Sequence, residues 1–142
     1  FQYYFNAALR ISGYGNKYLD QMDEWRDQLE LGLTTWRETP EPSRSDCHAW
    51  SSSPNIEIFR TVLGISSAAP GYNKVRIEPH PGNLNNLSGS VPHPNGKINV
   101  SIKKLKNKTA IQIKLPKDIY GDLIWKGKTY LLKGKSIYSF EL

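Results

Sequence analysis

The sequence predicts a protein that is helical in its first half and a small antiparallel β-sandwich in its second half. Apolar residues recur at helical spacing as far as about residue 63. From residue 72 onward they alternate with polar residues in short runs separated by turn signals. The 142 residues suffice for one or two domains. We place the boundary in the stretch of small residues and proline at 66–71, which gives domains of residues 1–68 and 69–142.

The first half begins with two predicted helices joined by a short turn. The helix over residues 1–11 has one apolar face, formed by Phe1, Tyr4, Phe5, Ala8 and Ile11. Gly13 is suited to end it in the left-handed conformation. The second helix is expected from Asn16, a candidate N-cap, to Glu30. Its apolar stripe consists of Tyr18, Met22, Trp25 and Leu29.

Helical signals return after a Pro- and Ser-containing break at residues 39–43. We expect helix again from Ser45 or Asp46. Pro54 either begins a fresh helix, capped by Ser52 or Ser53, or kinks one continuous helix. The buried stripe of this helix is predicted to be Ile56, Phe59 and Leu63, with Gly64 at its end.

Six or seven short strands are predicted in the second half. The apolar alternation places them near residues 75–77, 87–91, 98–102, 110–115, 123–126, 129–132 and 137–142. Residues 92–96, with the sequence PHPNG, are a strong turn signal, and residues 107–108 fit the turn of a hairpin. Short strands with regular turns are typical of a β-sandwich.

Charge is distributed unevenly along the chain. Residues 97–142 contain eleven Lys, no Arg and three acidic residues, whereas residues 1–96 contain eight basic and ten acidic residues. We interpret the Lys excess as solvated strand faces and protected sheet edges. A nucleic-acid surface would mix Arg and exposed aromatic residues with the Lys, so no nucleic-acid partner is expected. No run approaches the roughly 20 apolar residues of a membrane span, and a single Cys excludes an internal disulfide.

Residues 32–50, GLTTWRETPEPSRSDCHAW, gather the residue types that sugar sites use. The segment contains carboxylates for proton transfer, Trp rings that can lie against a pyranose, and a His that can bond hydroxyl groups. Glu38 stands beside Trp36, and apolar surroundings raise the pKa of a carboxyl group, whereas a neighbouring Arg37 would lower it. No metal-ligand spacing occurs in the sequence, and no cofactor is expected.

The order of residues in this segment resembles the bacterial α-L-rhamnosidases of glycoside hydrolase family 78. The matching motifs are Gly32-x-Thr34-Thr35-x-x-Glu38, Cys47-His48-x-Trp50-Ser51-x-x-Pro54, Arg60-Thr61-Val62-Leu63-Gly64-Ile65, Pro70-Gly71-Tyr72, Lys74-Val75, Ile77-Glu78-Pro79-His80 and Gly89-Ser90-Val91-Pro92-His93-Pro94-Asn95-Gly96. The resemblance implies that residues 1–68 are the closing helices of an (α/α)6 toroid and that residues 69–142 are an appended β-sandwich.

The same resemblance assigns roles to individual residues. It implies that Glu38 is the general base of an inverting hydrolysis of terminal α-L-rhamnose or a similar sugar, and that the general acid precedes this chain. His48 is implied to contact the sugar. Trp36 and Arg37 are further candidate sugar contacts, although their order differs from that of many family members. Trp50 either stacks on the sugar or fills the core under the loop.

Two other residues of the segment have simpler interpretations. Asp46 either binds a hydroxyl or, as we favour, caps the following helix. Cys47 is expected to be a small buried hydrophobic residue. A Cys47–His48 nucleophilic pair is rejected, because adjacent side chains on a helix point apart.

The expected partners are a carbohydrate substrate and the rest of the barrel, and no membrane. Helices cut from a toroid would expose apolar faces, so we expect self-association of the isolated chain, which should also be inactive. The resemblance implies a periplasmic or extracellular bacterial protein. One alternative is a non-catalytic carbohydrate-binding or structural module, and another is a polyanion-binding domain that uses the Lys-rich region.

Overall fold

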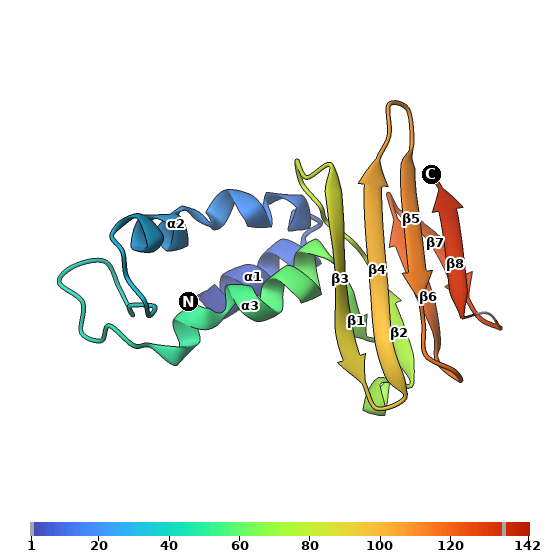
Figure 1. Ribbon diagram of the computed structural model, residues 1–142, viewed down its shortest axis with the longest axis horizontal. Coiled ribbons are helices and arrows are strands. Elements are labelled where there is room, and N and C mark those ends of the chain that lie inside the picture. Colours follow the sequence, from blue (N-terminus) through green and yellow to red (C-terminus); the bar gives the residue numbers. More distant parts are fainter. Residues whose placement is uncertain (1, 135) are drawn as a thin grey trace.

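The computed structural model describes residues 2–134 and 136–142 and shows an elongated helical part followed by two facing β-sheets (Figure 1). Helices precede strands, as the sequence predicts, and the second half is sandwich-like. Among the described residues, no helix is both long and apolar enough to cross a membrane. The division into domains at residue 68 stays a prediction.

The helical part consists of short elements. They are α1 (Gln2–Ile11), the 3₁₀ turn η1 (Gly15–Gln21), α2 (Asp23–Glu30), the 3₁₀ turn η2 (Ala49–Ser52), α3 (Pro54–Glu57) and the π-helical turn η3 (Ile58–Val62). Gly13 has a φ of 80° between α1 and η1, as expected for the end of a helix. The apolar face of α1 is largely exposed, and Phe1, predicted to belong to it, lies outside the described residues.

The second predicted helix is wrong in three respects. It is divided at Met22, because η1 has the tighter 3₁₀ winding and only α2 is α-helical. The change in winding shifts the buried side, so that Gln28 is 1% exposed whereas Leu29 is 62% exposed. Asn16 is not its cap, since its side-chain oxygen accepts a hydrogen bond from the Gly82 N–H at 3.0 Å.

The predicted helix at Ser45 or Asp46 is also wrong, because helical structure resumes only at Ala49. The backbone groups of this stretch are bonded across the loop instead of along a helix. The Ser45 carbonyl accepts the Glu38 N–H at 2.8 Å, and the His48 N–H bonds the Trp36 carbonyl at 2.8 Å.

Pro54 begins α3, the first of the two predicted arrangements, and Ser53 occupies the N-cap position without making a side-chain cap bond. The predicted buried stripe is confirmed only at Leu63. Ile56 and Phe59 are 57% and 39% exposed, because the face packed toward η1 is formed by Glu57, Thr61 and Val62. The apolar period marked a side of the helix that the described chain covers only in part.

Eight strands form two four-stranded sheets. The first has the order β1 (Ile65–Ser67), β2 (Lys74–Ile77), β6 (Tyr120–Trp125) and β7 (Lys128–Leu132); the second has the order β3 (Asn86–His93), β4 (Gly96–Lys104), β5 (Thr109–Lys114) and β8 (Ile137–Glu141). All pairs are antiparallel except β2 with β6, which the prediction of an antiparallel sandwich missed. It also missed β1, whose three residues lie where a linker was expected.

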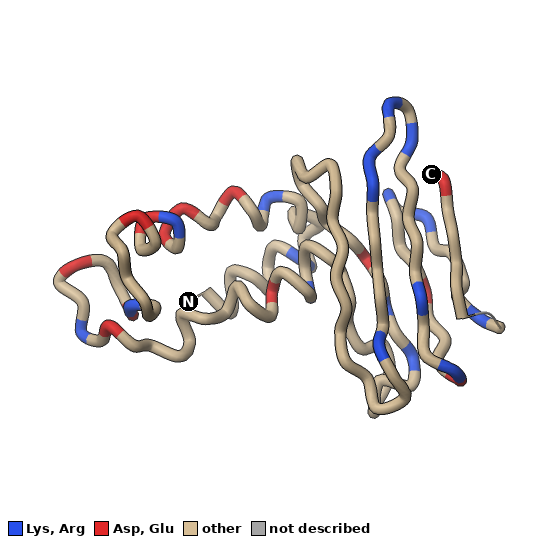
Figure 2. The backbone as a smooth tube through the Cα atoms, in the orientation of Figure 1, with Lys and Arg blue, Asp and Glu red and all other residues tan. Residues whose placement is uncertain are grey.

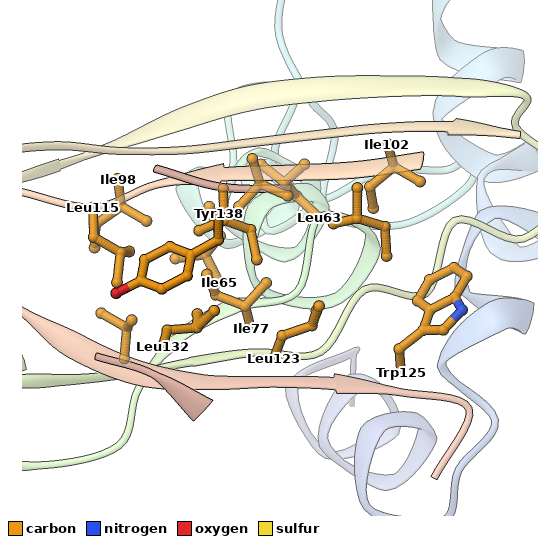
Figure 3. Close-up of a cluster of buried hydrophobic side chains, with 14 of the residues drawn as sticks. Leu63, Ile65, Ile77, Ile98, Ile102, Leu115, Leu123, Trp125, Leu132 and Tyr138 are labelled. Atoms are coloured by element: carbon orange, nitrogen blue, oxygen red, sulfur yellow. The ribbon is translucent and has the colours of Figure 1, made fainter. Parts of the chain in front are cut away.

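The hydrophobic core lies between the sheets (Figure 3). Strand β4 contributes Ile98, Val100 and Ile102, and β5 contributes Ile111 and Ile113; each of these is at most 3% exposed. This alternation is the one that the sequence predicts, since successive side chains of a strand point to opposite faces. Leu63 at the end of the helical part joins the same core.

Residues 78–82 tie the helical part to the sandwich. The Glu78 N–H bonds the Gly64 carbonyl at 2.9 Å, and the His80 N–H bonds the Val62 carbonyl at 3.1 Å. Gly82 completes the junction, because its N–H bonds Asn16 and its carbonyl accepts the Lys104 ammonium at 2.7 Å. The two parts of the chain are therefore joined by hydrogen bonds as well as by one peptide link.

Candidate functional site

The candidate sugar-binding segment forms a loop between α2 and η2, at the end of the helical part far from the sheets (Figure 1). The two backbone hydrogen bonds described above hold it as an irregular hairpin. The Thr35 hydroxyl adds a third bond across it, to the Asp46 carbonyl at 2.6 Å. The loop therefore brings Trp36 and Glu38 close to His48 without regular secondary structure.

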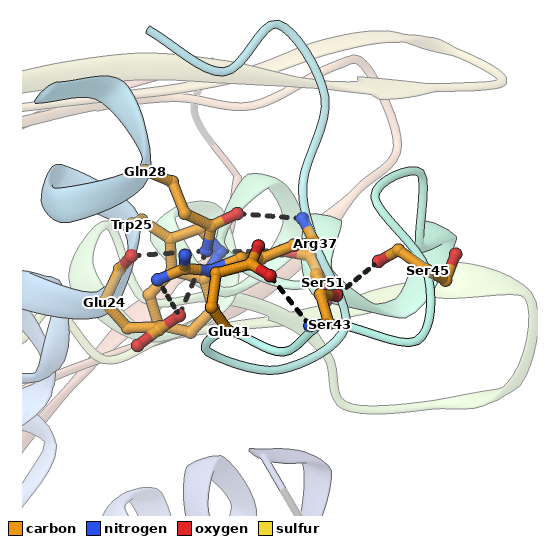
Figure 4. Close-up of polar contacts among 8 residues, drawn as sticks. All are labelled: Glu24, Trp25, Gln28, Arg37, Glu41, Ser43, Ser45 and Ser51. Carbon is orange, nitrogen blue, oxygen red and sulfur yellow. Dashed lines mark hydrogen bonds and ion pairs between the residues drawn. The ribbon is translucent and has the colours of Figure 1, made fainter. Parts of the chain in front are cut away.

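Helix α2 anchors one side of this loop (Figure 4). The Gln28 side-chain oxygen accepts the Arg37 N–H at 2.8 Å, and the Arg37 guanidinium lies 3.4 Å from a Glu24 carboxylate oxygen. Trp25 donates from its indole nitrogen to the Ser51 carbonyl at 2.7 Å. Arg37 is 7% exposed. In this structure Arg37 therefore braces the loop against α2, and its predicted sugar contact stays a prediction.

Glu38 is paired with Arg44, a partner that the sequence motifs do not predict. The Arg44 Nε donates to one carboxylate oxygen at 2.9 Å, and the guanidinium Nη2 donates to the other. These bonds lower the pKa of Glu38, and His48 adds a weaker effect in the same direction. We expected Arg37 to lower this pKa, but Arg37 is bonded to Glu24 instead. The spacing of six residues across a hairpin turn was the only sequence signal for the pairing with Arg44.

His48 and Trp50 extend the group around Glu38. The His48 Nδ1 lies 4.0 Å from a Glu38 carboxylate oxygen, and the rings of His48 and Trp50 meet edge to face with centroids 6.2 Å apart. Trp50 is 85% exposed, so in this structure it does not fill the core under the loop. Its side chain is available to a ligand, whereas Trp36 is partly buried.

Two expectations for neighbouring residues are wrong. Cys47 is exposed rather than buried, because residues 45–48 do not form the helix that would have turned it inward. Asp46 does not cap a helix, since the cap position of η2 is occupied by His48.

The group around Glu38 combines an exposed indole ring with partly covered ionisable side chains. Two clefts of the structure, with volumes of about 710 and 510 Å³, are lined by other residues and not by Glu38, His48 or Trp50. Within residues 2–134 and 136–142 there is no cluster of three or more His, Cys, Asp or Glu that could hold a metal ion. The arrangement provides an ionised carboxylate, a histidine and an exposed indole ring, which suits proton transfer and sugar contact once a pocket is completed.

Comparisons with known proteins find a sequence family for the second half of the chain and solved structures that are similar to most of the chain. A family model described as the bacterial alpha-L-rhamnosidase C-terminal domain matches residues 64–135. No curated protein matches the chain in sequence. Among solved structures, a GH78 family rhamnosidase of Bacillus sp. GL1 is 29% identical, with a TM-score of 0.76, over 86% of this chain and 14% of that chain.

Two more distant structures share the fold. The alpha-L-rhamnosidase of Aspergillus terreus is 19% identical, with a TM-score of 0.75, over 95% of this chain and 18% of that one. The Streptomyces avermitilis alpha-L-rhamnosidase, solved in complex with L-rhamnose, is 19% identical, with a TM-score of 0.61, over 82% of this chain and 14% of that one. The chain thus spans less than a fifth of these rhamnosidases.

The family match runs from residue 64 to residue 135, which is half of the chain, and covers the sandwich except for β8. The structural matches extend over most of the chain, helices included. The residues predicted to act on a sugar lie before residue 64, so their roles stay predictions. On the match over residues 64–135, the chain belongs to the family of bacterial α-L-rhamnosidase C-terminal domains, at the C-terminal end of a GH78-type protein.

Proposed function

We propose that this chain is the C-terminal part of an inverting glycoside hydrolase that removes terminal α-L-rhamnose, or a similar sugar, and that Glu38 is its general base. The ion pair between Glu38 and Arg44 is the single observation that carries this assignment. A general base must be ionised at the working pH, and Arg44 lowers the pKa of Glu38. His48 and the exposed Trp50 stand where a sugar bound near Glu38 would meet them.

The proposed mechanism needs two carboxyl groups. Glu38 removes a proton from a water molecule that attacks the anomeric carbon, while a general acid protonates the departing oxygen on the opposite side of the sugar. The two carboxyl groups of such a pair stand roughly 6.5–9.5 Å apart, which leaves room for the water. We place the acid in the portion of the enzyme that precedes residue 1.

The helices fit this proposal as the closing elements of an (α/α)6 toroid. Several large apolar side chains on them are exposed: Tyr3, Tyr4, Phe5, Ile11, Ile56, Ile58 and Phe59. Exposed apolar surface of this extent usually marks an interaction site. We propose that the rest of the barrel covers these faces and completes the pocket over Glu38. We also propose that the intact enzyme is a periplasmic or extracellular bacterial protein.

The test of the assignment is the Glu38→Gln variant of the full-length enzyme. A positioned general base contributes about 10²–10⁴-fold to the rate, so turnover of an aryl α-L-rhamnoside should fall at least about 100-fold with folding preserved. Glu41→Gln is the matched control, since Glu41 is an exposed carboxylate of the same loop that bonds only the Ser43 N–H in this structure. Turnover close to normal in Glu38→Gln would remove Glu38 as the base.

The isolated 142-residue chain is expected to be inactive, because the proposal places the general acid and most of the pocket in the rest of the enzyme. A sensitive assay of the purified chain with the same aryl rhamnoside checks this expectation. Turnover above the uncatalysed rate that disappears in Glu38→Gln would show that both members of the pair are present in the chain.

A non-catalytic carbohydrate-binding or structural module is the second candidate. It is favoured by the family match, which covers the sandwich and not the loop containing Glu38. The parent gene discriminates between the two. Several hundred further codons upstream, with repeated helical hairpins and a candidate acid, would support the hydrolase, whereas a start codon close to residue 1 would support the module.

A further inference from the structure

A cleft of about 710 Å³ lies between the helical part and one end of the sandwich, remote from the loop that contains Glu38. The β4–β5 turn, the β6–β7 turn and residues 78–82 line it. Its volume is within the range of about 300–1,000 Å³ that small-molecule sites occupy. The proposed hydrolysis at Glu38 does not use this cleft.

A buried hydrogen-bond donor without a partner belongs to its lining. Trp125 is 7% exposed, and its indole nitrogen has no hydrogen-bond partner among the described residues. In Figure 3 this nitrogen is on the side of the ring that faces away from the other core side chains. Because an indole nitrogen only donates, and a buried donor without an acceptor is costly, the Trp125 N–H calls for an acceptor oxygen, supplied by a water molecule or a ligand.

Positively charged side chains line the same cleft. Lys104, Lys106, Lys108 and Lys126 line the cleft, and Figure 2 shows blue segments gathered at the β4–β5 turn at the top of the sheets. Lys108 is paired with Glu141, whereas Lys106 and Lys126 have no acidic partner among the described residues. The Lys126 ammonium lies over the Trp125 ring, 5.7 Å from its centroid, so this lysine and the unpaired donor belong to the same part of the cleft.

Acidic groups do not cancel this charge. Glu78, the acidic residue in the lining, is bonded to Arg76 at 2.7 Å. The cleft is also held in shape, because Gly82 accepts from Lys104 and is bonded to Asn16. A ligand would therefore meet two ammonium groups that have no acidic partner among the described residues, and one buried N–H, all of which donate hydrogen bonds to oxygen.

We propose that this cleft is a binding site for an acidic sugar, whose carboxylate or sulfate group accepts from the Trp125 N–H and is held by Lys106 and Lys126. The anionic character follows from the donors, and the choice of a sugar rests on the proposed function. Within the intact enzyme the site holds a charged part of the glycan at a distance from the hydrolysed bond.

The experiment is an NMR titration of the ¹⁵N-labelled 142-residue chain with D-galacturonate and, separately, D-galactose. These sugars differ only in the group at C6, so the comparison isolates the carboxylate. The indole N–H signal that is lost in Trp125→Phe identifies Trp125. We expect galacturonate to shift this signal with a Kd at least about fivefold lower than that of galactose, and more salt to weaken its binding.

Matched variants distinguish binding in the cleft from a general attraction of the anion to the positively charged surface. Lys106→Gln with Lys126→Gln should weaken galacturonate binding about five- to tenfold, because two charged contacts are lost. Lys114→Gln with Lys117→Gln removes the same charge from two exposed lysines outside the cleft and should leave the Kd unchanged. If Trp125→Phe does not fold, the lysine variants still test the proposal, since their residues are exposed or outside the core.

Each of several outcomes would overturn the site. They are an unmoved Trp125 signal, equal affinity for the two sugars, and equal weakening by both lysine pairs. Sodium sulfate or a short DNA duplex that shifts the signal at lower concentration than galacturonate would mean a general polyanion surface instead. Loss of activity in Glu38→Gln is independent of this result, so the failure of one proposal does not hide the failure of the other.

Discussion

At the scale of single residues, the loop around Glu38 shows how a partner decides the state of an ionisable group. Glu38 has Trp36 as a neighbour in sequence, which favours a raised pKa, yet its carboxylate bonds Arg44 and its pKa is lowered. A carboxylate whose pKa is lowered in the folded state stabilises the fold above its unfolded pKa, and loses that contribution as the pH falls. Because Arg44 is largely exposed, solvent screens this contribution.

His80 should make the free energy of unfolding depend on pH in a higher pH range than Glu38 does. The cause is burial of the side chain and not an ion pair. Burial against the helical part lowers the pKa of His80; nearby Arg76 acts in the same direction and Glu78 in the other. The unfolded chain therefore binds a proton at a pH where folded His80 is still neutral. The free energy of unfolding should fall as the pH drops from about 6.5, the ordinary value for His, to the lowered pKa of the folded state.

Urea unfolding of the chain between pH 8 and pH 5.5 measures this effect, with His80→Gln as the comparison. At pH 8 His80 is neutral in both states, so that value sets the baseline of each protein. The decrease toward pH 5.5 should be smaller in the variant, since its side chain does not titrate. An identical decrease in both proteins would assign the pH dependence to other groups.

At the scale of elements, the junction between helix and sandwich depends on Gly64. Its φ is 79°, and a Cβ built on it would lie 2.2 Å from the carbonyl carbon of Glu78. Gly13 has nearly the same φ, 80°, but a Cβ there would meet nothing within 4 Å. The two glycines therefore separate the effect of backbone conformation from that of close packing.

Alanine at each position tests this distinction. Gly13→Ala should lower the free energy of unfolding by about 1–2 kcal/mol, the cost of a left-handed residue with a side chain. Gly64→Ala should cost about 1–3 kcal/mol more, because the backbone at Glu78 must also move. Chemical denaturation of both variants gives the two values. Equal losses would mean that the junction opens without strain.

The elements also show what a sequence pattern can and cannot predict. The alternation of Ile98, Val100 and Ile102 predicted both a strand and its buried side, because a strand of a sandwich has one face on the core. The helical spacing of Ile56 and Phe59 predicted an apolar side correctly, but not that it is exposed here. Periodicity states which residues share a face, whereas burial depends on whether another element covers that face.

The candidate sites were predictable to different degrees for a similar reason. Glu38 and His48 were found through a local motif, but Arg44 as a partner of Glu38 depends on the path of the loop. The cleft beside Trp125 was not predicted at all. It joins turns of both sheets to residues 78–82, and only the paired strands bring these segments together.

At the scale of the whole molecule, the chain has two kinds of surface. The sandwich has a closed core and carries most of the lysines on its strands and turns (Figure 2). The helical part instead exposes apolar side chains, such as Tyr4 at 74% and Ile56 at 57%. Copies of a protein with a net positive charge repel one another, whereas exposed apolar surface favours their association. The helical part should therefore determine how the isolated chain associates.

We expect the isolated chain to self-associate through these helical faces, because in the absence of the remaining barrel another copy offers the nearest apolar surface. Sedimentation velocity over a hundredfold range of concentration measures the association, and raising the salt should strengthen it by screening the positive charge. Tyr4→Lys with Ile56→Lys should return the chain to monomer without loss of stability, since both side chains are largely exposed. Leu131→Lys, at a residue of β7 that is 64% exposed, is the control and should leave association unchanged. A chain that is monomeric throughout the concentration range would show that these faces need no cover, and it would weaken their interpretation as surfaces made to pack against a barrel.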